Sequence, residues 1–297
     1  MKILVTGVGG QVGFELARSL QPFGQVVAID RDQVDLADEQ ALTAYVEALQ
    51  PGLIVNPAAY TAVDLAEQEE SLAQAINGTA PGVLARVARR LGALMVHYST
   101  DYVFDGSKNA PYEPGDATGP INAYGRTKLA GEQAVAAAGG DWLVLRTSWV
   151  FAARGKNFVR TMLRLAQERE ELRVVADQIG APTSARLIAD TTAQIVHAAL
   201  RQRRAGSFES GIHHLVAGGE TSWHGFTEAI VEGARTRLPA GQIKTTRVVP
   251  IATADYPTPA CRPVNSRLSV HSLTERFGVI LPPWQEGLSL TLDEVLA

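Results

Sequence analysis

Short apolar segments alternate with longer amphipathic ones through the first half of the chain, and this alternation constrains the fold more than any other feature. The segments KILVTG, VVAID, LIVNPAA, LMVHYST and WLVLRTS are continuously apolar, as strands covered on both faces are. Helical patterns lie between them, at about 11–21, 38–49, 70–91 and 124–138. Strand and helix repeated in this order predict a doubly wound α/β fold, in which a parallel sheet is joined by right-handed crossovers.

A glycine-rich turn, VTGVGGQVG, follows the first of these segments and opens the next helix. Gly7, Gly10 and Gly13 fit the spacing G-x-x-G-x-x-G, whereas the pattern G-x-G-x-x-G fails at Val12. Glycines permit positive φ and close backbone approach, and the free N–H groups of a helix N-terminus bind a pyrophosphate. Because the turn directly follows a buried strand, it predicts a Rossmann-type dinucleotide site.

The second apolar segment ends in an acidic residue. Asp30 stands 17 residues after Gly13, where a carboxylate accepts hydrogen bonds from an adenosine ribose. This favours NAD, whereas the adjacent Arg31 can meet the 2′-phosphate of NADP, so the prediction is NADPH or NADH. The same groove is expected to include Asp35, Leu36, Ala58, Ala59, Tyr60 and Thr61.

The regular alternation loosens after Ser148. GIHHLV at 211–216 has the pattern of a further buried strand, and SARLIADTTAQIVHAALRQRR before it that of a helix. The tail from 217 is rich in proline and turn residues. We therefore expect an NAD(P)-binding domain of residues 1–148 and about 177–216, and a smaller C-terminal substrate-binding lobe of about 149–176 and 217–297.

Composition excludes several classes of partner. A formal net charge of -4 with no long basic run argues against nucleic acid binding. No apolar stretch approaches the roughly 20 residues of a membrane helix, and the N-terminal run is too short for a signal peptide. The one cysteine, Cys261, excludes an internal disulfide and fits a reducing compartment, so we expect a cytoplasmic protein. Cys261 itself is expected to be a small packed side chain.

The sequence YGRTK places Tyr124 and Lys128 on one face of a predicted helix, one turn apart. This spacing is common on ordinary helix surfaces, so it needs support from its surroundings. Ser99, Thr100 and Asp101 end the fourth apolar segment, at the edge of the sheet where the cofactor is expected.

These residue types suit the reduction of a carbonyl group. A tyrosine must give a proton to the developing alkoxide, and its ordinary pKa of about 10 is high for that task. A neighbouring ammonium stabilises the phenolate and lowers the pKa. A threonine hydroxyl can donate to the carbonyl oxygen and orient it. Tyr124, Lys128 and Thr100 are therefore the predicted catalytic residues.

The segments TGVGGQVG, NPAAYTAVDLAE, YSTDYVFDG, NAYGRTKLAGE, LRTSWVF and GAPTSARLIAD together resemble the extended short-chain dehydrogenase/reductases. The likeness runs from residue 1 to about 192 and resumes at RPVNSRLS and PPWQEGL. YSTDYVFDG joined to YGRTKLAGE and GAPTS is similar to the members that reduce nucleotide-linked keto sugars. The resemblance implies reduction of the C4 keto group of dTDP-4-dehydro-β-L-rhamnose to dTDP-L-rhamnose, a precursor of cell-envelope glycans.

The resemblance also implies residue roles. Gly10, Gln11 and Val12 would hold the pyrophosphate, with Gly7 in the same turn. Tyr124 would be the proton donor, Lys128 its tuner and ribose anchor, and Thr100 the residue that orients the carbonyl. The implied sugar-binding residues are Thr100, Asp101, Trp149, Asn157 and Arg262. Trp149 would close over the nicotinamide and the sugar, although a tryptophan ending a strand is as often part of the core.

No resident metal is expected. His97, within a buried strand, is interpreted as a core histidine, and His213 and His214 lack companions at ligand spacing. Some relatives are thought to dimerise around a divalent metal held by glutamates, one of them at the position of Glu15. The second position holds the cation Arg186 here, so the resemblance favours a monomer or a metal-free homodimer.

Two other functions stay open at this point. A nucleotide-sugar epimerase or 4,6-dehydratase would share the Tyr/Lys pair, but a dehydratase should carry an acid pair beside the threonine, and Asp101 is followed by Tyr102. A non-catalytic regulatory relative would not need Thr100, Tyr124 and Lys128, and all three are present.

Overall fold

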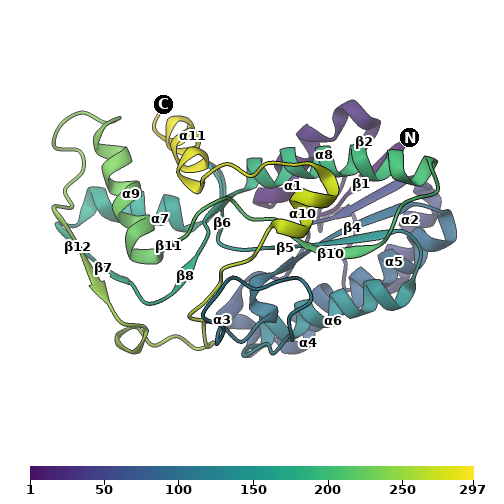
Figure 1. Ribbon diagram of the computed structural model, residues 1–297, viewed down its shortest axis with the longest axis horizontal. Helices are drawn as coiled ribbons and strands as arrows, with labels where there is room; N and C mark the ends of the chain where they lie inside the picture. Colours follow the sequence, from purple (N-terminus) through teal and green to yellow (C-terminus); the bar gives the residue numbers. More distant parts are fainter.

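The computed structural model describes residues 1–297, and at its centre lies a six-stranded sheet whose strands are all parallel (Figure 1). In spatial order the strands are β10 (Gly211–His214), β5 (Trp142–Thr147), β4 (Leu94–Thr100), β3 (Leu53–Asn56), β1 (Lys2–Val5) and β2 (Gln25–Ala28). The five apolar segments supply β1 to β5, and GIHHLV supplies β10. The predicted doubly wound α/β fold is confirmed.

The order of the strands creates a crevice at one edge of the sheet. β2 and β3 lie on opposite sides of β1, so the direction of the connections reverses there. Val5 stands in register with Ala28 and Val55, and the three strands therefore end at the same level. In open parallel sheets, ligands bind beyond the carboxyl ends of the strands at such a reversal.

Helices cover both faces of the sheet (Figure 1). One face carries α1 (Gln11–Ser19) and α8 (Ala185–Arg204), which pack on each other. The opposite face carries α2 (Glu39–Leu49), α5 (Ala80–Leu91) and α6 (Ala123–Ala138). Successive strand residues point to opposite faces, and both faces of β1, β3, β4 and β5 are largely buried, which is why these strands are continuously apolar.

The predicted single helix over 70–91 is interrupted in its middle. The structure has α4 (Glu70–Gln74), a π-helical turn over Ala75–Thr79, and then α5. Pro81 has no N–H to donate to the carbonyl of Asn77, so the regular α-helical ladder cannot pass this point. That carbonyl lies against α6, where a Cβ built on Gly131 would stand 2.1 Å from it.

The remaining elements lie beside the sheet, on the left in Figure 1, around a separate apolar core that includes Phe151, Phe226 and Trp284. They are α7 (Phe158–Glu168), α9 (Trp223–Arg235), α11 (Trp284–Leu296), the parallel pair β7 (Glu171–Val175) and β12 (Arg247–Ile251), the parallel pair β6 (Val150–Phe151) and β9 (Thr183–Ser184), and the antiparallel pair β8 (Ile179–Gly180) and β11 (Thr221–Ser222). The boundaries of two domains stay a prediction.

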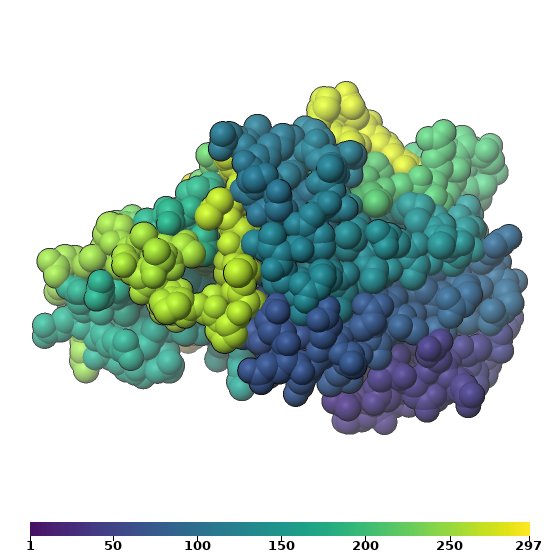
Figure 2. All heavy atoms as spheres, turned by 90° about the horizontal axis from the view of Figure 1, so that it is seen from below, coloured from purple at the N-terminus to yellow at the C-terminus, as the bar shows by residue number.

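Short elements complete the chain. They are α3 (Val63–Ala66), α10 (His271–Phe277) and the 3-10 turns Gln21–Phe23, Asp101–Val103 and Thr253–Asp255. Residues 260–269, here called the C-terminal strap, are largely without regular structure, and Figure 2 shows this yellow-green segment against the blue and teal part of the molecule. No helix combines the length and the apolar character that crossing a membrane requires.

We predict that Gly131→Ala destabilises the protein. Alanine favours a helix over glycine by about 1 kcal/mol, so propensity alone predicts the opposite result. The added Cβ would meet the Asn77 carbonyl at 2.1 Å, and such overpacking costs about 1–3 kcal/mol. Urea unfolding measures the change. Gly115→Ala is the control, because its Cβ meets nothing within 4 Å. A more stable Gly131→Ala variant would contradict this contact.

Candidate active site

The turn between β1 and α1 has no room for a side chain at Gly7 or Gly13. Gly7 has a φ of +59°, and a Cβ on it would lie 2.9 Å from the Cα of Ala58. A Cβ on Gly13 would lie 2.2 Å from the carbonyl oxygen of Gly7. The N-cap of α1 is Gly10, and no side chain caps the helix, so its first N–H groups are free for an anion.

The acidic residue after β2 is tied to this turn. The carboxylate of Asp30 accepts a hydrogen bond from the N–H of Gly9 at 3.0 Å, a glycine that the sequence pattern did not single out. A Cβ on Gly9 would lie 2.2 Å from the same carboxylate, so the residue must stay small. The side chain of Arg31 is 75% exposed and pairs with Asp35 at 3.5 Å. A phosphate on the ribose could therefore reach Arg31 without displacing a buried group.

A cavity of about 630 Å³ lies between this turn, the ends of β3 and β4, and the start of α6. All the residues predicted for the cofactor line it, namely Gly7, Gly10, Gln11, Val12, Asp30, Arg31, Asp35, Leu36, Ala58, Ala59, Tyr60, Thr61, Tyr124 and Lys128. The structure adds lining residues that the sequence analysis did not assign to the cofactor, among them Thr6, Tyr98, Ser99, Thr147 and Lys156. The roles of all these residues in cofactor binding stay a prediction.

The polar groups of this cavity fit a dinucleotide. The hydroxyl oxygens of Ser99 and Thr147 and the amide oxygen of Gln11 are buried and have no hydrogen-bond partner in the protein. A buried polar atom without a partner is costly, so each of these atoms is suited to a polar ligand. The free N–H groups of the α1 N-terminus suit a pyrophosphate in the same way. NADPH or NADH satisfies both requirements.

The helix α6 carries the predicted proton donor. It begins after Asn122, whose side chain accepts from the N–H of Gly125 at 2.8 Å and donates to the carbonyl of Cys261 at 2.8 Å. This cap ties the start of α6 to the C-terminal strap. Tyr124 and Lys128 project from the helix into the same cavity.

The electrostatics of this pair differ from the expectation. Burial raises the pKa of Tyr124, the charge of Asp101 adds to the rise, and a hydrogen bond with Thr100 opposes it. Burial lowers the pKa of Lys128 to about 8, against the opposing charge of Glu132. The Lys128 ammonium donates to the carbonyl of Tyr98 at 2.6 Å. In this arrangement burial therefore outweighs any stabilisation of the phenolate by Lys128.

Two glycines let α6 approach the rest of the site backbone to backbone. A Cβ on Gly125 would lie 2.1 Å from the carbonyl oxygen of Tyr102, and Gly131 meets the Asn77 carbonyl as described above. The buried side chain of Asn77 bonds the N–H and the carbonyl of Tyr60 and the hydroxyl of Thr127. Asn77 thus joins the Tyr60 loop to α6, a positioning role that no sequence motif indicated.

A buried ion pair anchors α6 to β5. The guanidinium of Arg146 makes two hydrogen bonds to the carboxylate of Glu132, at 2.8 and 2.7 Å. The two side chains are only 3% and 2% exposed. Arg146 also donates to the carbonyl of Pro114 at 3.2 Å. Glu132 stands one helical turn after Lys128, so the pair fixes the orientation of the catalytic helix.

The predicted sugar-binding residues are distributed unevenly. Thr100 and Asp101 lie together at the end of β4, where the threonine hydroxyl donates to the carboxylate at 2.9 Å. Arg262 lies in the strap, donates to Asp64 at 2.9 Å, and its charge acts on the neighbouring Tyr102. Thr100 and Asp101 lie beside Tyr124, whereas Arg262 lies beside Tyr102, which packs edge to face on Tyr124 with centroids 5.7 Å apart.

Trp149 and Asn157 have other partners in the structure. Trp149 has a φ of +49°, and its ring stacks on Trp223 of α9 with centroids 3.6 Å apart. Gly180 permits this position, because a Cβ there would lie 2.6 Å from the Trp149 ring. The side chain of Asn157 caps α7 and donates to the carbonyls of Ala152 and Arg154. Neither residue lines the large cavity, and their contacts with a sugar stay predictions.

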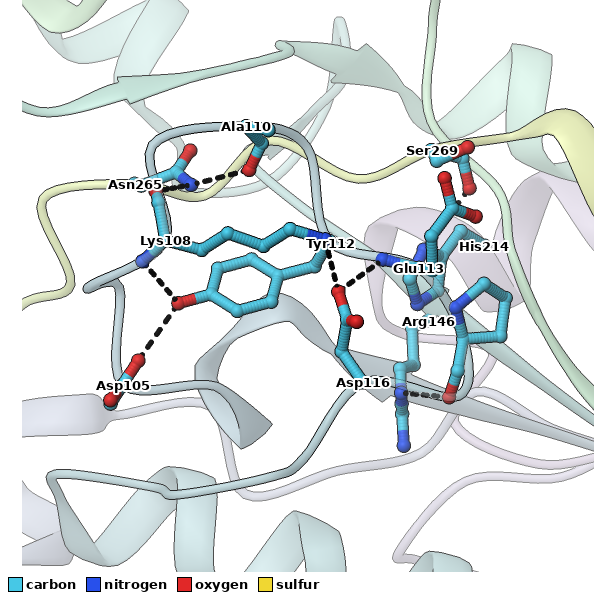
Figure 3. A network of polar contacts seen from close by, with 11 residues as sticks. Asp105, Lys108, Ala110, Tyr112, Glu113, Asp116, Arg146, His214, Asn265 and Ser269 are labelled. Carbon is cyan, nitrogen blue, oxygen red and sulfur yellow. Dashed lines mark hydrogen bonds and ion pairs between the residues drawn. The ribbon is translucent and has the colours of Figure 1, made fainter.

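The loop that follows Asp101 is held by the C-terminal strap (Figure 3). The hydroxyl of Tyr112 donates to Asp105 at 2.8 Å and accepts from the N–H of Lys108. The side chain of Asn265 donates to the carbonyls of Lys108 and Ala110, at 2.6 and 3.0 Å. These bonds hold the strap beside the end of β4.

The remaining candidates have structural partners. His97 is fully buried and bonds Asn56 through Nδ1, and burial lowers its pKa well below the ordinary value. His213 bonds Ser272 and Arg276, and His214 bonds the Ser269 carbonyl (Figure 3). The expectation for Cys261 was wrong, because its side chain is exposed. The strap turns outward there, and only its backbone carbonyl is engaged, by Asn122.

The position of Arg186 fits the argument about the dimer metal. Its guanidinium lies 3.7 Å from Glu15 and also pairs with Glu294 of α11. Glu15 is bonded by Arg18 as well, at 3.1 Å. The carboxylate of Glu15 thus already has two cationic neighbours within the chain.

The parallel sheet, the glycine turn and the cavity beside it agree with the resemblance to the extended short-chain dehydrogenase/reductases that the sequence motifs carry. The family described as RmlD substrate binding domain matches residues 1–297. The chain is 57% identical, over the full length of both, to a dTDP-4-dehydrorhamnose reductase of Burkholderia thailandensis. It is 44% identical to an enzyme of the same name from Escherichia coli, over 99% of this chain and 98% of that one.

A solved structure agrees with these relatives. The dTDP-4-dehydrorhamnose reductase of Bacillus anthracis in complex with NADP superposes with a TM-score of 0.89 at 34% identity, covering 99% of each chain. The chain belongs to the RmlD substrate binding domain family, and relatives that carry the name dTDP-4-dehydrorhamnose reductase match it over nearly its whole length.

We predict that Glu132→Gln lowers the free energy of unfolding by about 3–5 kcal/mol, because it leaves the buried Arg146 guanidinium without a counter-charge. The double variant Glu132→Met with Arg146→Met should be much closer to the wild type, since it removes both charges. Chemical denaturation of the two variants measures the difference. Equal loss in both would show that the shape of the site, and not the pairing of charge, matters there.

Proposed function

We propose that this chain reduces the C4 keto group of dTDP-4-dehydro-β-L-rhamnose with NADPH or NADH and forms dTDP-L-rhamnose. The observation that carries the proposal is the position of Tyr124 and Lys128 in the cavity that the glycine turn also lines, with Thr100, at the end of β4, hydrogen-bonded to Tyr124. The proposal is supported by the family to which the chain belongs, because a relative that is 57% identical carries the name dTDP-4-dehydrorhamnose reductase. The NADP complex of the Bacillus anthracis relative supports the cofactor.

The residues divide the work of the reaction among them. When bound, the reduced nicotinamide supplies the hydride that adds to the keto carbon. Tyr124 gives its proton to the keto oxygen, which becomes the new hydroxyl. Thr100 orients the oxygen through its hydroxyl. Lys128, held by the Tyr98 carbonyl, keeps a positive charge beside the phenolate that remains and anchors the ribose of the cofactor.

The sugar contacts are part of this proposal. We assign Thr100 and Asp101 to the sugar because they stand beside Tyr124, and Arg262 because its guanidinium lies in the strap beside Tyr102. Trp149 would have to leave its stacking on Trp223 to cover the nicotinamide. Asn157 would contribute through the loop before α7, where its side chain donates to the carbonyls of Ala152 and Arg154.

The alternatives differ in what they require. A dehydratase needs an acid pair next to the threonine, and here Asp101 is followed by Tyr102. An epimerase keeps its cofactor through the cycle and consumes none. A regulatory relative would not need Thr100, Tyr124 and Lys128, and all three are present. The chain is further expected to act in the cytoplasm, as a monomer or a metal-free homodimer, since Arg186 already pairs with Glu15.

The decisive experiment follows absorbance at 340 nm with purified protein, NADPH or NADH, and freshly generated dTDP-4-dehydrorhamnose. One equivalent of cofactor oxidised for each dTDP-rhamnose formed would support the reductase. Binding of both cofactors without turnover would leave the fold assignment intact and favour another sugar nucleotide or a regulatory role.

We predict that Tyr124→Phe lowers kcat by about 10²–10⁴-fold, because it removes the proton donor and leaves the ring in place. The dissociation constant of the cofactor, measured by fluorescence titration, should change little. Near-normal turnover would remove Tyr124 from the role of proton donor.

We predict that Arg31→Ala lowers kcat/KM for NADPH by about tenfold, the value of one charge-assisted hydrogen bond, and leaves the value for NADH nearly unchanged. Each cofactor is the control for the other in the same variant. An equal loss with both cofactors would show that Arg31 acts on the shape of the Asp30 loop and not on the 2′-phosphate.

A further inference from the structure

The hydroxyl of Thr100 is already committed in the structure. It donates its only proton to Oδ1 of Asp101 at 2.9 Å, and it accepts from the N–H of Tyr102 at 3.2 Å. A hydroxyl has one donor and two acceptor sites. In this arrangement Thr100 offers a lone pair, and no proton, to Tyr124 or to a substrate. A keto oxygen accepts hydrogen bonds only, so this state of Thr100 cannot orient it.

The carboxyl of Asp101 has no opposite charge to stabilise it. The residue is 4% exposed, and its Oδ2 is buried without a hydrogen-bond partner. No cation acts on this carboxyl, and the two cations of the site have other partners, because Lys128 is held by the Tyr98 carbonyl and Arg262 by Asp64. The side chains that face Asp101 are Tyr124 from α6, Tyr102 from the turn after β4, and Ser266 from the strap.

A proton on Asp101 reverses the hydrogen bond. A protonated carboxyl can donate to Thr100, and the threonine proton is then free to turn toward the keto oxygen. A carboxylate can only accept, and it holds the threonine proton. The charge of this one buried group thus determines whether Thr100 is a donor or an acceptor at the reacting atom.

We propose that Asp101 is a positioning residue for the reduction, and that its protonated form makes Thr100 the hydrogen-bond donor to the substrate oxygen. The inference rests on the proposed reductase function. It assigns Asp101 an effect on the chemical step that a contact with the sugar alone would not have.

The acidity of Asp101 is consistent with this role. Burial raises the pKa of its carboxyl to about 6, and the hydroxyls of Ser266 and Thr100 oppose the rise. The folded-state pKa is therefore above the ordinary value of about 3.9. As pH rises through about 6 the folded protein loses the proton, and the donor state of Thr100 is lost with it.

The test compares pH profiles of kcat and KM, from initial rates between pH 4.5 and 9, for the wild type and Asp101→Asn. The wild-type kcat should fall about tenfold as pH rises through about 6, with little change in KM, because the lost bond orients the reacting oxygen. Asparagine has the same shape and can donate an N–H to Thr100 at every pH. The kcat profile of Asp101→Asn should therefore lack this fall, and it should keep any change in kcat near pH 8 that the titration of Lys128 causes.

Two further variants separate this role from others. Thr100→Val should also lack the fall near pH 6, because no hydroxyl remains to be turned. If Asp101 acted on the sugar directly, the fall would persist in Thr100→Val, and the proposal would be overturned. Asp64→Asn is the matched control. Asp64 is a second carboxyl near Tyr102 that makes no bond to Thr100, so the kcat of this variant should still fall as pH rises through about 6.

Other outcomes are also decisive. A wild-type profile that is flat between pH 5 and 7.5, or a fall that survives in Asp101→Asn, overturns the proposal and leaves the reductase function standing. A wild type without turnover at any pH overturns both. Thermal melts check that Asp101→Asn is folded. The stability that the protonated carboxyl contributes is present below pH about 4 and is lost as pH rises through about 6, so Asp101→Asn should gain on the wild type over that interval.

Discussion

The site depends on a contact between backbones. α6 lies against the turn after β4 and against the π-helical turn of residues 75–79, at distances that only Gly125 and Gly131 allow. This contact sets the depth at which Tyr124 and Lys128 enter the cavity. The buried pair of Glu132 and Arg146 then fixes the rotation of the helix. The geometry of the proposed catalytic site is therefore determined by packing beneath it as much as by the residues that line it.

Much of the fold could be predicted because its causes are local. β1, β3, β4 and β5 are largely buried on both faces, so each leaves a continuous apolar run in the sequence, whereas the edge strand β2 is only partly buried. The interruption at residues 75–79 could not be predicted from such a run. Pro81 lies inside a strongly helical pattern, and the Asn77 carbonyl, to which Pro81 has no N–H to donate, lies against α6.

The two halves of the site differ in how far the sequence predicts them. The cofactor half follows from backbone requirements, because the glycine turn and the strand ends constrain residue types at fixed spacing. The part of the site that we propose to bind the sugar depends on side chains from segments that are distant in sequence. Trp149 stacks on Trp223, which lies far along the chain in α9, and no local sequence pattern indicates that contact. The amide of Asn157 donates to a carbonyl of its own loop, which no local sequence pattern indicates either.

The C-terminal strap shows why segments distant in sequence must be considered together. A Cβ on Gly106 would lie 2.7 Å from Pro263, so the loop after Asp101 and the strap are shaped for each other. Asn265 fixes the same loop through two carbonyls, which brings Ser266 to the Asp101 carboxyl. A change in the strap would therefore alter the surroundings of Asp101 and Thr100 without touching any residue of the glycine turn. The wall of the proposed site that includes Thr100 and Asp101 is thus built by two parts of the chain, and its chemistry depends on how firmly they are held together.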